Sequence, residues 1–120
     1  LQHRGQESAG IVAVNAGDVH AIRAMGLVSD QFSKDKMATL TGSVAMGHTR
    51  YSTAGSSTIE NAQPALVRFK GGHIALAHNG NLTNALDIRG QLEDEGSIFS
   101  SSADSEVIVH RLAKAKAEKP

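Results

Sequence analysis

The sequence has no cysteine among its 120 residues. A disulfide scaffold, a thiolate metal site and an internal cysteine nucleophile are therefore excluded within these residues. An excess of charge of one sign is missing too, because 12 Lys and Arg residues balance 12 Asp and Glu residues. This balance gives no electrostatic reason to expect a nucleic acid or an anionic membrane as a partner.

Long apolar runs are also missing. No uninterrupted apolar stretch is long enough to span a membrane, and no basic segment followed by an apolar one stands at the start. We therefore expect a cytoplasmic protein. With 40% hydrophobic and 20% charged residues, the composition is that of a folded domain rather than a disordered segment. A chain of this length corresponds to one small domain or to a piece of one.

Both ends of the sequence indicate a fragment. The first residue is Leu1 rather than Met, and the stretch that follows resembles the end of a helix entering a turn at Gly5. The last residues, 114–120, are rich in Lys, Ala and Glu, which is typical of a helix that runs into a polar tail. A natural small protein with a processed N-terminus is the alternative. It is disfavoured because a small core without its first element is hard to stabilise.

Alternating apolar residues and turn residues predict strands in the first part of the chain. A hairpin is expected over 11–25 with its turn at 15–18, and a second hairpin over 66–77. A buried strand is expected over 43–49. The segment 51–63 has no periodicity and is rich in Ser, Thr, Gly and Asn, so we expect a long functional loop there.

Helical spacing dominates the last part of the chain. Ser29 is expected to cap a short early helix. A second helix is expected from Thr83 to near Gly96, and a last one after a capping-box pattern at 101–104. Strands followed by helices favour an α+β fold. The residues that set the spacing are Phe32, Met37 and Leu40, then Leu86, Ile88 and Leu92 facing inward, then Val107, Ile108, Arg111 and Leu112.

Two adjacent hydrogen-bond donors follow the second hairpin. The Asn79 side-chain amide and the Gly80 backbone N–H stand where a strand ends and a helix is about to begin. A tetrahedral oxyanion needs two such donors side by side. Gly80 also allows a positive φ and the close approach of a ligand. Asn-Gly is equally the commonest turn dipeptide, so spacing alone favours a simple turn.

Two charged residues could hold the ends of a small zwitterion. Arg50 ends a predicted strand and could clamp a carboxylate through two parallel N–H bonds, with the hydroxyls of Ser52 and Thr53 adding contacts. Asp104, in the first turn of the last helix, could face an ammonium group. Taken singly, a surface arginine and a helix-capping aspartate are the simpler interpretations. If Arg50, Asp104 and the Asn-Gly donors converge in the fold, together they would suit an amino acid that contains a reacting carbonyl.

The six histidines do not predict a metal site. No two of them are spaced i, i+4, and there is no HExxH. His48 and His78 each end a predicted buried strand and could be neighbours, more simply as hydrogen-bonded core residues than as ligands. A GxGxxG motif and a P-loop are absent, so nothing indicates a nucleotide cradle.

Several motifs, in a fixed order from Leu1 to about Val109, resemble those of class II glutamine amidotransferase domains. Several motifs in order are far more specific than any one alone. The amidophosphoribosyltransferase branch is the most similar, since the glucosamine-6-phosphate synthase branch tends to carry Trp where Tyr51 stands. Glutamate synthase and asparagine synthetase fit less well. The motifs are Gln2–Ile11, Gly47–Gly55, Asn61–Pro64, His78–Asn84 and Ser102–Glu106.

The resemblance implies the Ntn-hydrolase fold, a four-layer αββα sandwich, here incomplete without its first strand and most of its first helix. Residues 1–120 would then be a partial glutamine amidotransferase domain. In this family an N-terminal cysteine attacks the side-chain amide of glutamine, and its own α-amino group serves as the base. A thioester forms, ammonia leaves, and water then releases glutamate.

The resemblance also implies residue roles. Asn79 and Gly80 would form the oxyanion hole. Arg50 would hold the glutamine α-carboxylate and Asp104 the α-ammonium. The remaining implied roles are pocket lining for Thr53, a place close to the nucleophile for Arg4, and a structural role for His78.

The missing cysteine is the departure from the family pattern. We therefore expect these 120 residues alone to be inactive. The phosphoribosyltransferase domain, with its phosphoribosyl pyrophosphate and Mg²⁺, would lie beyond Pro120. Glutamine is the expected partner of this segment, no cofactor is expected within it, and the full-length enzyme is expected to be a homo-oligomer. Whether that enzyme carries an iron–sulfur cluster is an open question, because the ligands would lie outside this segment. The alternatives are another class II amidotransferase and a non-catalytic glutamine-binding module.

Overall fold

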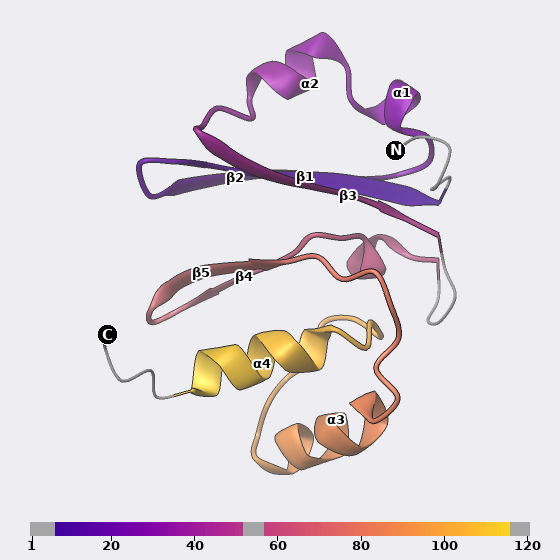
Figure 1. The fold of residues 1–120 in the computed structure, drawn as a ribbon, viewed down its shortest axis with the longest axis vertical. Coiled ribbons are helices and arrows are strands. Elements are labelled where there is room, and N and C mark those ends of the chain that lie inside the picture. The colour runs from indigo at the N-terminus through magenta and orange to yellow at the C-terminus, as the bar shows by residue number, and fades with distance from the viewer. Residues whose placement is uncertain (1–6, 52–56, 116–120) are drawn as a thin grey trace.

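The computed structural model describes residues 7–51 and 57–115. These residues form four layers (Figure 1): two short helices, a three-stranded sheet, a two-stranded sheet and two longer helices. The predicted αββα sandwich is confirmed. Each layer covers the apolar face of the next, which is how helices and sheets bury a common core.

The first sheet is built on a central strand. Strand β1 (Ser8–Asn15) pairs antiparallel with β2 (Asp18–Met25) on one side and β3 (Val44–Arg50) on the other. Ala16 and Gly17 connect the first two strands with φ values of 48° and 94°. Positive φ at both turn positions matches the twist of the flanking strands. The predicted first hairpin is thus confirmed.

Strand β3 differs from the prediction of a buried strand. Val44 is 67% exposed and Met46 is 40% exposed, and the strand becomes buried only at Arg50. Among the described residues, β3 lies at the edge of its sheet and pairs only with β1. An apolar run indicates that a segment prefers an extended conformation, but it does not reveal how many neighbours cover it.

The second sheet confirms the other predicted hairpin. Strands β4 (Ala65–Phe69) and β5 (Gly72–Leu76) pair antiparallel. The short 3₁₀ helix η2 (Ile59–Asn61) precedes them, and the Gln63–Pro64 peptide bond between η2 and β4 is cis.

Four α-helices form the outer layers. Ser33, and not the predicted Ser29, caps the second one, because its Oγ accepts a hydrogen bond from the Lys36 N–H. Ser29 lies inside the first helix. The third helix ends as predicted, since Gly96 has a φ of 85° and closes the last turn. The helices are α1 (Val28–Gln31), α2 (Lys34–Ala38), α3 (Ala85–Asp94) and α4 (Glu106–Lys114).

The inward face of α3 is only partly as predicted. Leu92 is fully buried, whereas Leu86 is 83% exposed. Ala85 and Leu92, two helical turns apart, define the face that packs, and Leu86 lies about 100° away from Ala85 on the helix. The predicted capping box at 101–104 is also wrong, because no side chain caps α4 and Ser105 stands at its N-cap.

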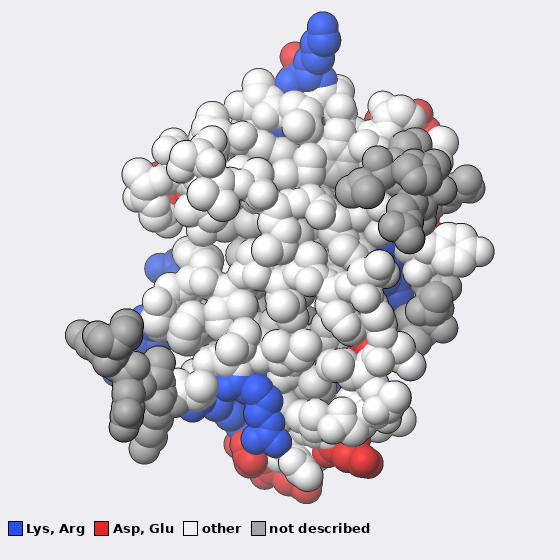
Figure 2. Space-filling view, viewed as in Figure 1, with Lys and Arg blue, Asp and Glu red and all other residues white. Residues whose placement is uncertain are grey.

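Charged side chains are unevenly distributed on the surface. On the face shown in Figure 2 they gather mainly over α2 and around α3 and α4, and the middle of that face has few of them. No helix in the described ranges has both the length and the apolar character needed to cross a membrane.

We predict that Leu92→Ala lowers the free energy of unfolding by about 2–5 kcal/mol, because it leaves a cavity in the core. Leu86→Ala, on the same helix, is the control and should change it by less than about 0.5 kcal/mol. Urea denaturation of both variants measures the difference. Equal losses would show that the burial assigned to α3 is wrong.

Candidate functional site

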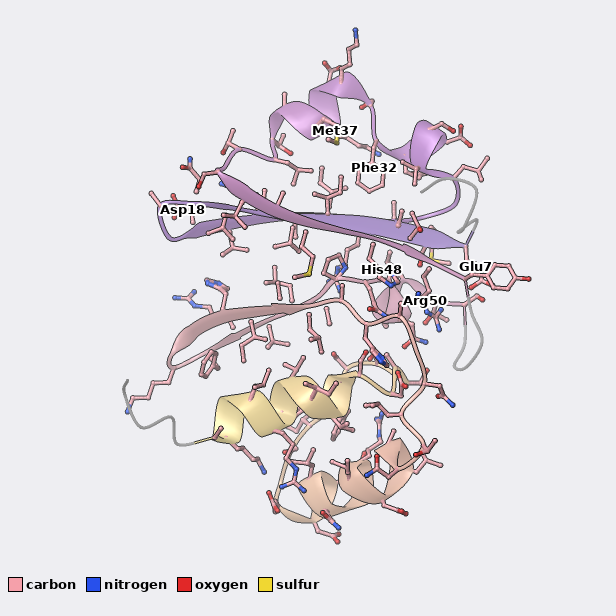
Figure 3. All side chains as sticks on the ribbon, viewed as in Figure 1. Glu7, Asp18, Phe32, Met37, His48 and Arg50 are labelled. Atoms are coloured by element: carbon pink, nitrogen blue, oxygen red, sulfur yellow. The ribbon has the colours of Figure 1, made fainter. Side chains whose placement is uncertain are left out.

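The register of the first sheet directs Arg50 and His48 towards the second sheet (Figure 3). Ser8 pairs with Arg50 and Gly10 with His48, and alternate residues of a strand share one face. That face lies close to the segment that leads into β4, because a side chain on Gly10 would collide with the backbone carbonyl of Gln63. Arg50 and His48 therefore lie on the inner face of the sandwich.

Arg50 is buried, so the surface interpretation is wrong. Its side chain is 8% exposed, and Nη1 lies 3.8 Å from Oε2 of Glu7, the residue before β1. The Ser57 hydroxyl donates to the same Glu7 oxygen at 3.0 Å. A guanidinium has five N–H donors in a planar fork, a geometry that matches a carboxylate.

His48 links β3 to the segment after β5. Burial lowers the pKa of His48, a hydrogen bond with the His78 backbone partly opposes this, and the Arg50 charge lowers the pKa further. The ring is therefore neutral at pH 7. The predicted closeness of the two histidines is confirmed.

The segment that carries the Asn-Gly donors is held at both ends. The His78 N–H donates to Gln63 Oε1 at 2.6 Å, and the Leu82 N–H donates to Asp104 Oδ2 at 2.6 Å. Asp104 Oδ1 also lies 3.9 Å from His78 Nδ1. Asp104 thus faces the 78–82 segment instead of capping its own helix, which corrects the capping interpretation.

Gly80 is needed for space. Gly80 does not use the positive φ that glycine allows, but a Cβ there would lie 2.8 Å from His78 Nε2. Asn79 and Gly80 are exposed, and neither the Asn79 side chain nor the Gly80 N–H has a hydrogen-bond partner among the described residues. Two adjacent donors therefore remain available to a ligand.

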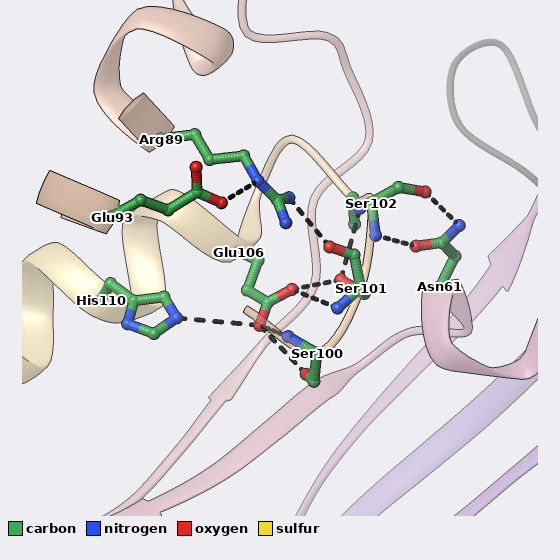
Figure 4. A network of polar contacts seen from close by, with 9 residues as sticks. Asn61, Arg89, Glu93, Ser100, Ser101, Ser102, Glu106 and His110 are labelled. Atoms are coloured by element: carbon green, nitrogen blue, oxygen red, sulfur yellow. Dashed lines mark hydrogen bonds and ion pairs between the residues drawn. The ribbon is translucent and has the colours of Figure 1, made fainter. Parts of the chain in front are cut away.

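A second polar network surrounds Glu106 at the start of α4 (Figure 4). Its Oε1 accepts hydrogen bonds from the Ser100 N–H at 2.8 Å and the Ser100 hydroxyl at 3.0 Å. Its Oε2 accepts from the Ser101 N–H at 2.8 Å and from the Ser101 hydroxyl. Burial would raise the pKa of Glu106, but these hydrogen bonds outweigh it and lower the pKa. The carboxylate is therefore ionised although it is buried.

Asn61 extends this network to η2. Its Oδ1 accepts from the Ser102 N–H at 3.0 Å, and its Nδ2 donates to the Ser102 hydroxyl at 2.8 Å. Arg89 holds the same loop from α3, because its Nη1 donates to the Ser101 carbonyl at 2.9 Å. Its guanidinium lies 4.2 Å from the centre of the Phe99 ring.

Two predicted site residues, Arg4 and Thr53, lie outside the described residues. Arg50, Asn79, Gly80 and Asp104 belong to connected segments, since contacts run from β3 through the two histidines to the Asp104 carboxylate. The glutamine-binding roles of these residues stay predictions.

Four residues that contribute to this region had no role assigned from the sequence. Glu7 pairs with Arg50, and Gln63 binds the segment after β5. Asn61 and Glu106 bind the serines before α4. All four fall within the motifs quoted above, and their place in those motifs was the only signal available.

The described residues contain no group of three or more His, Cys, Asp or Glu side chains that could hold a metal ion. An apolar pocket of about 190 Å³ lies between α1 and the first sheet. Neither Arg50 nor Asp104 lines it, and its walls include Ile11, Val28 and Phe32. His48 also lines this pocket, so the pocket borders the site without including its charged side chains.

Comparison with known proteins identifies the family. The profile of the glutamine amidotransferase domain matches residues 9–118. The chain belongs to this family. Amidophosphoribosyltransferase of Methanothermobacter thermautotrophicus is 53% identical over 120 residues, which is 100% of this chain and 25% of that protein. Amidophosphoribosyltransferase of Lacticaseibacillus casei is 51% identical over 115 residues, which is 95% of this chain and 59% of that protein.

Two solved structures of longer proteins have the same fold. Glutamine phosphoribosylpyrophosphate amidotransferase of B. subtilis, complexed with ADP and GMP, has a TM-score of 0.87 and 43% identity, covering 98% of this chain and 25% of that one. A structure of an allosteric regulatory enzyme of purine biosynthesis has a TM-score of 0.91 and 45% identity, covering 99% and 26%. The amidotransferase domain described here therefore spans about a quarter of these longer proteins.

In this amidotransferase domain we predict that Glu106→Gln lowers the free energy of unfolding at pH 7 by about 2–3 kcal/mol, because an amide N–H₂ would face donors that now bind a carboxylate. The folded pKa of Glu106 is lowered from 4.5, so the carboxylate stabilises the fold fully above pH 4.5. The difference should shrink as pH falls through the folded pKa. Denaturation at a series of pH values measures it.

Glu93→Gln is the matched control, because the Glu93 side chain is 50% exposed and pairs only with Arg89 on its own helix. It should change the unfolding free energy by about 0.5 kcal/mol or less. A constant difference between wild type and Glu106→Gln at all pH values would contradict an ionised Glu106.

We also predict that Gly80→Ala destabilises the domain by about 1–3 kcal/mol, because the added methyl group must displace the His78 ring. Gly90→Ala, inside α3 with nothing within 4 Å of the new Cβ, should instead stabilise it by about 0.5–1 kcal/mol. Thermal unfolding compares the two variants. The same sign for both would contradict the contact between Gly80 and His78.

Proposed function

We propose that this chain is the glutamine-binding part of an amidophosphoribosyltransferase, which takes ammonia from the side-chain amide of glutamine and delivers it to phosphoribosyl pyrophosphate in purine biosynthesis. The names of the relatives support this reaction. The observation that carries the proposal is the hydrogen bond from the Leu82 N–H to Asp104, which brings a carboxylate to the segment that carries the donors of Asn79 and Gly80.

Each role follows from the chemistry of its residue. The Arg50 guanidinium pairs with the glutamine α-carboxylate, and Asp104 pairs with the α-ammonium. These two contacts orient the substrate so that its side-chain amide meets Asn79 and Gly80. The amide oxygen becomes negatively charged in the tetrahedral intermediate, and the two N–H donors stabilise it there. Arg4 and Thr53 complete the pocket in this proposal.

The nucleophile is not among these residues, since none of the 120 is cysteine. We infer that a cysteine elsewhere in the protein attacks the amide carbon, with its own α-amino group accepting the thiol proton. The new C–S bond gives a tetrahedral intermediate, whose C–N bond then breaks as the nitrogen takes up that proton and leaves as ammonia. Water hydrolyses the thioester to glutamate and regenerates the thiol. The 120 residues alone are expected to bind glutamine without cleaving it.

The remaining proposals concern the longer protein. Phosphoribosyl pyrophosphate and Mg²⁺ would bind to a separate phosphoribosyltransferase domain, and the full-length enzyme would be a cytoplasmic homo-oligomer. No cofactor is proposed for residues 1–120, and an iron–sulfur cluster would need ligands outside them because they include no cysteine.

A second candidate is a glutamine-binding module that has no catalytic role. The complete lack of cysteine favours it over a self-sufficient enzyme, while the pairing of Arg50 and Asp104 with a glutamine would be the same. The glutaminase domain of another class II amidotransferase is a third candidate with the same binding residues. Glutamine hydrolysis by a longer form of the protein that includes a cysteine separates the first candidate from the second, and its dependence on phosphoribosyl pyrophosphate separates the first from the third.

We predict that Arg50→Ala and Asp104→Ala each weaken L-glutamine binding by about 10- to 100-fold, which corresponds to one charge-assisted contact. Titration calorimetry with the purified chain measures the affinities. Glutaramate lacks the α-ammonium and 4-aminobutanamide lacks the α-carboxylate. Asp104→Ala should leave glutaramate binding unchanged, and Arg50→Ala should leave 4-aminobutanamide binding unchanged.

The matched controls are Arg68→Ala and Asp87→Ala, which remove exposed side chains of the same types from β4 and α3. Both should bind glutamine as the wild type does. If wild type does not bind glutamine, or if both site variants bind it normally, the proposed pocket is wrong.

A further inference from the structure

The segment that precedes Asp104 in the chain has no regular secondary structure. Between the end of α3 and the start of α4, residues 97–103 form neither helix nor strand. Three consecutive backbone N–H groups, those of Ser100, Ser101 and Ser102, are instead satisfied by side chains from elsewhere (Figure 4). We call Ser100–Ser102 the serine segment. Its conformation therefore depends on the side chains of Glu106 and Asn61.

Glu106 holds the first two residues of the serine segment. Both of its carboxylate oxygens accept from a serine N–H and from the hydroxyl of the same residue. The side chain is only 6% exposed, and His110 Nε2 lies 3.7 Å from its Oε1. A buried carboxylate with four donors has one strongly preferred geometry, so the loop is fixed from the side of α4.

Asn61 holds the third residue from the opposite side. It is 2% exposed and makes a two-way pair with Ser102, accepting from the N–H and donating to the hydroxyl. It belongs to η2, which stands between the end of β3 and the start of β4. Asn61 therefore ties the part of the chain that follows Arg50 to the loop that presents Asp104.

We propose that Asn61 is a positioning residue which, together with Glu106, holds the serine segment so that the Asp104 carboxylate is set for the α-ammonium of the substrate. Asn61 would thus determine how well the site distinguishes an α-amino acid from the same amide without its amino group. This inference rests on the proposed glutamine-binding function, but the geometry behind it does not.

A purely structural role predicts a different result. If the Asn61–Ser102 pair only stabilised the fold, its loss would weaken every ligand equally and loosen the structure everywhere. A positioning role acts through Asp104 alone, and it should affect only those ligands that carry the ammonium group. The two roles are therefore separated by the choice of ligand.

The first test is titration calorimetry of Asn61→Ala with L-glutamine and with glutaramate. We expect glutamine to bind about tenfold more weakly and glutaramate to bind within about twofold of wild type. In an Asp104→Ala background, Asn61→Ala should cause no further loss of glutamine affinity, because the group it acts through is gone. Asn84→Ala removes an exposed asparagine without a side-chain cap bond and is the matched control.

The second test needs no ligand. The Leu82 N–H donates to Asp104, so its hydrogen exchange reports whether Asp104 stays in place. In Asn61→Ala and in Glu106→Gln the exchange rate at Leu82 should rise about tenfold or more beyond any rise at Val12 in the core of β1, which reports global unfolding. This readout remains valid if either variant lowers overall stability, because global loosening would raise both rates.

The outcomes distinguish the two proposals. If wild type fails to bind glutamine, the proposed function is wrong, and the exchange rate at Leu82 alone decides whether Asn61 positions Asp104. If wild type binds glutamine and Asp104→Ala does not, while Asn61→Ala binds it normally, the proposed function stands and the positioning role is overturned. Equal losses for glutamine and glutaramate in Asn61→Ala would also overturn it.

Discussion

The close approach between Gly10 of β1 and the segment that leads into β4 is the constraint on which the rest of the structure depends. A side chain at this position would collide with the Gln63 carbonyl. On either side of Gly10, β1 is buried and built from small or medium residues such as Ser8, Ala9 and Val12. Gln63, which makes this contact, also accepts a hydrogen bond from the His78 N–H and so fixes the start of the segment with the two donors.

Three buried polar side chains of the sandwich each have a partner from another segment. Arg50 faces Glu7, Glu106 faces two serines, and Asn61 faces a third. A buried charge without a partner would cost several kcal/mol, so each of these groups requires its partner segment to be in place. The polar contacts therefore do more than stabilise the fold, since they determine which loops can lie next to which.

The features predicted best from the sequence are those that depend on residues a few positions apart in the chain. Both hairpins could be predicted because turn residues and alternation act over a few positions, as at Ala16 and Gly17. The exposure of Val44 and Leu86 could not, because it depends on which elements pack nearby. Asp104 resembles a helix cap locally, and only the fold reveals that it bonds to Leu82. The site residues were recognised through motifs whose order is specific, while their supports, such as Asn61, carried no separate signal.

The polar cluster is assembled from contacts of long sequence separation. Leu82 and Asp104 are 22 residues apart, and Asn61 and Ser102 are 41 apart. Contacts of this range close slowly, because the loop entropy must be overcome before the bond contributes. The hairpins can form early from local contacts, but the cluster exists only once the C-terminal helices have docked on the second sheet. Ligand binding would therefore report on the last stage of folding, and local opening of the helical layer would abolish it while the first sheet is still intact.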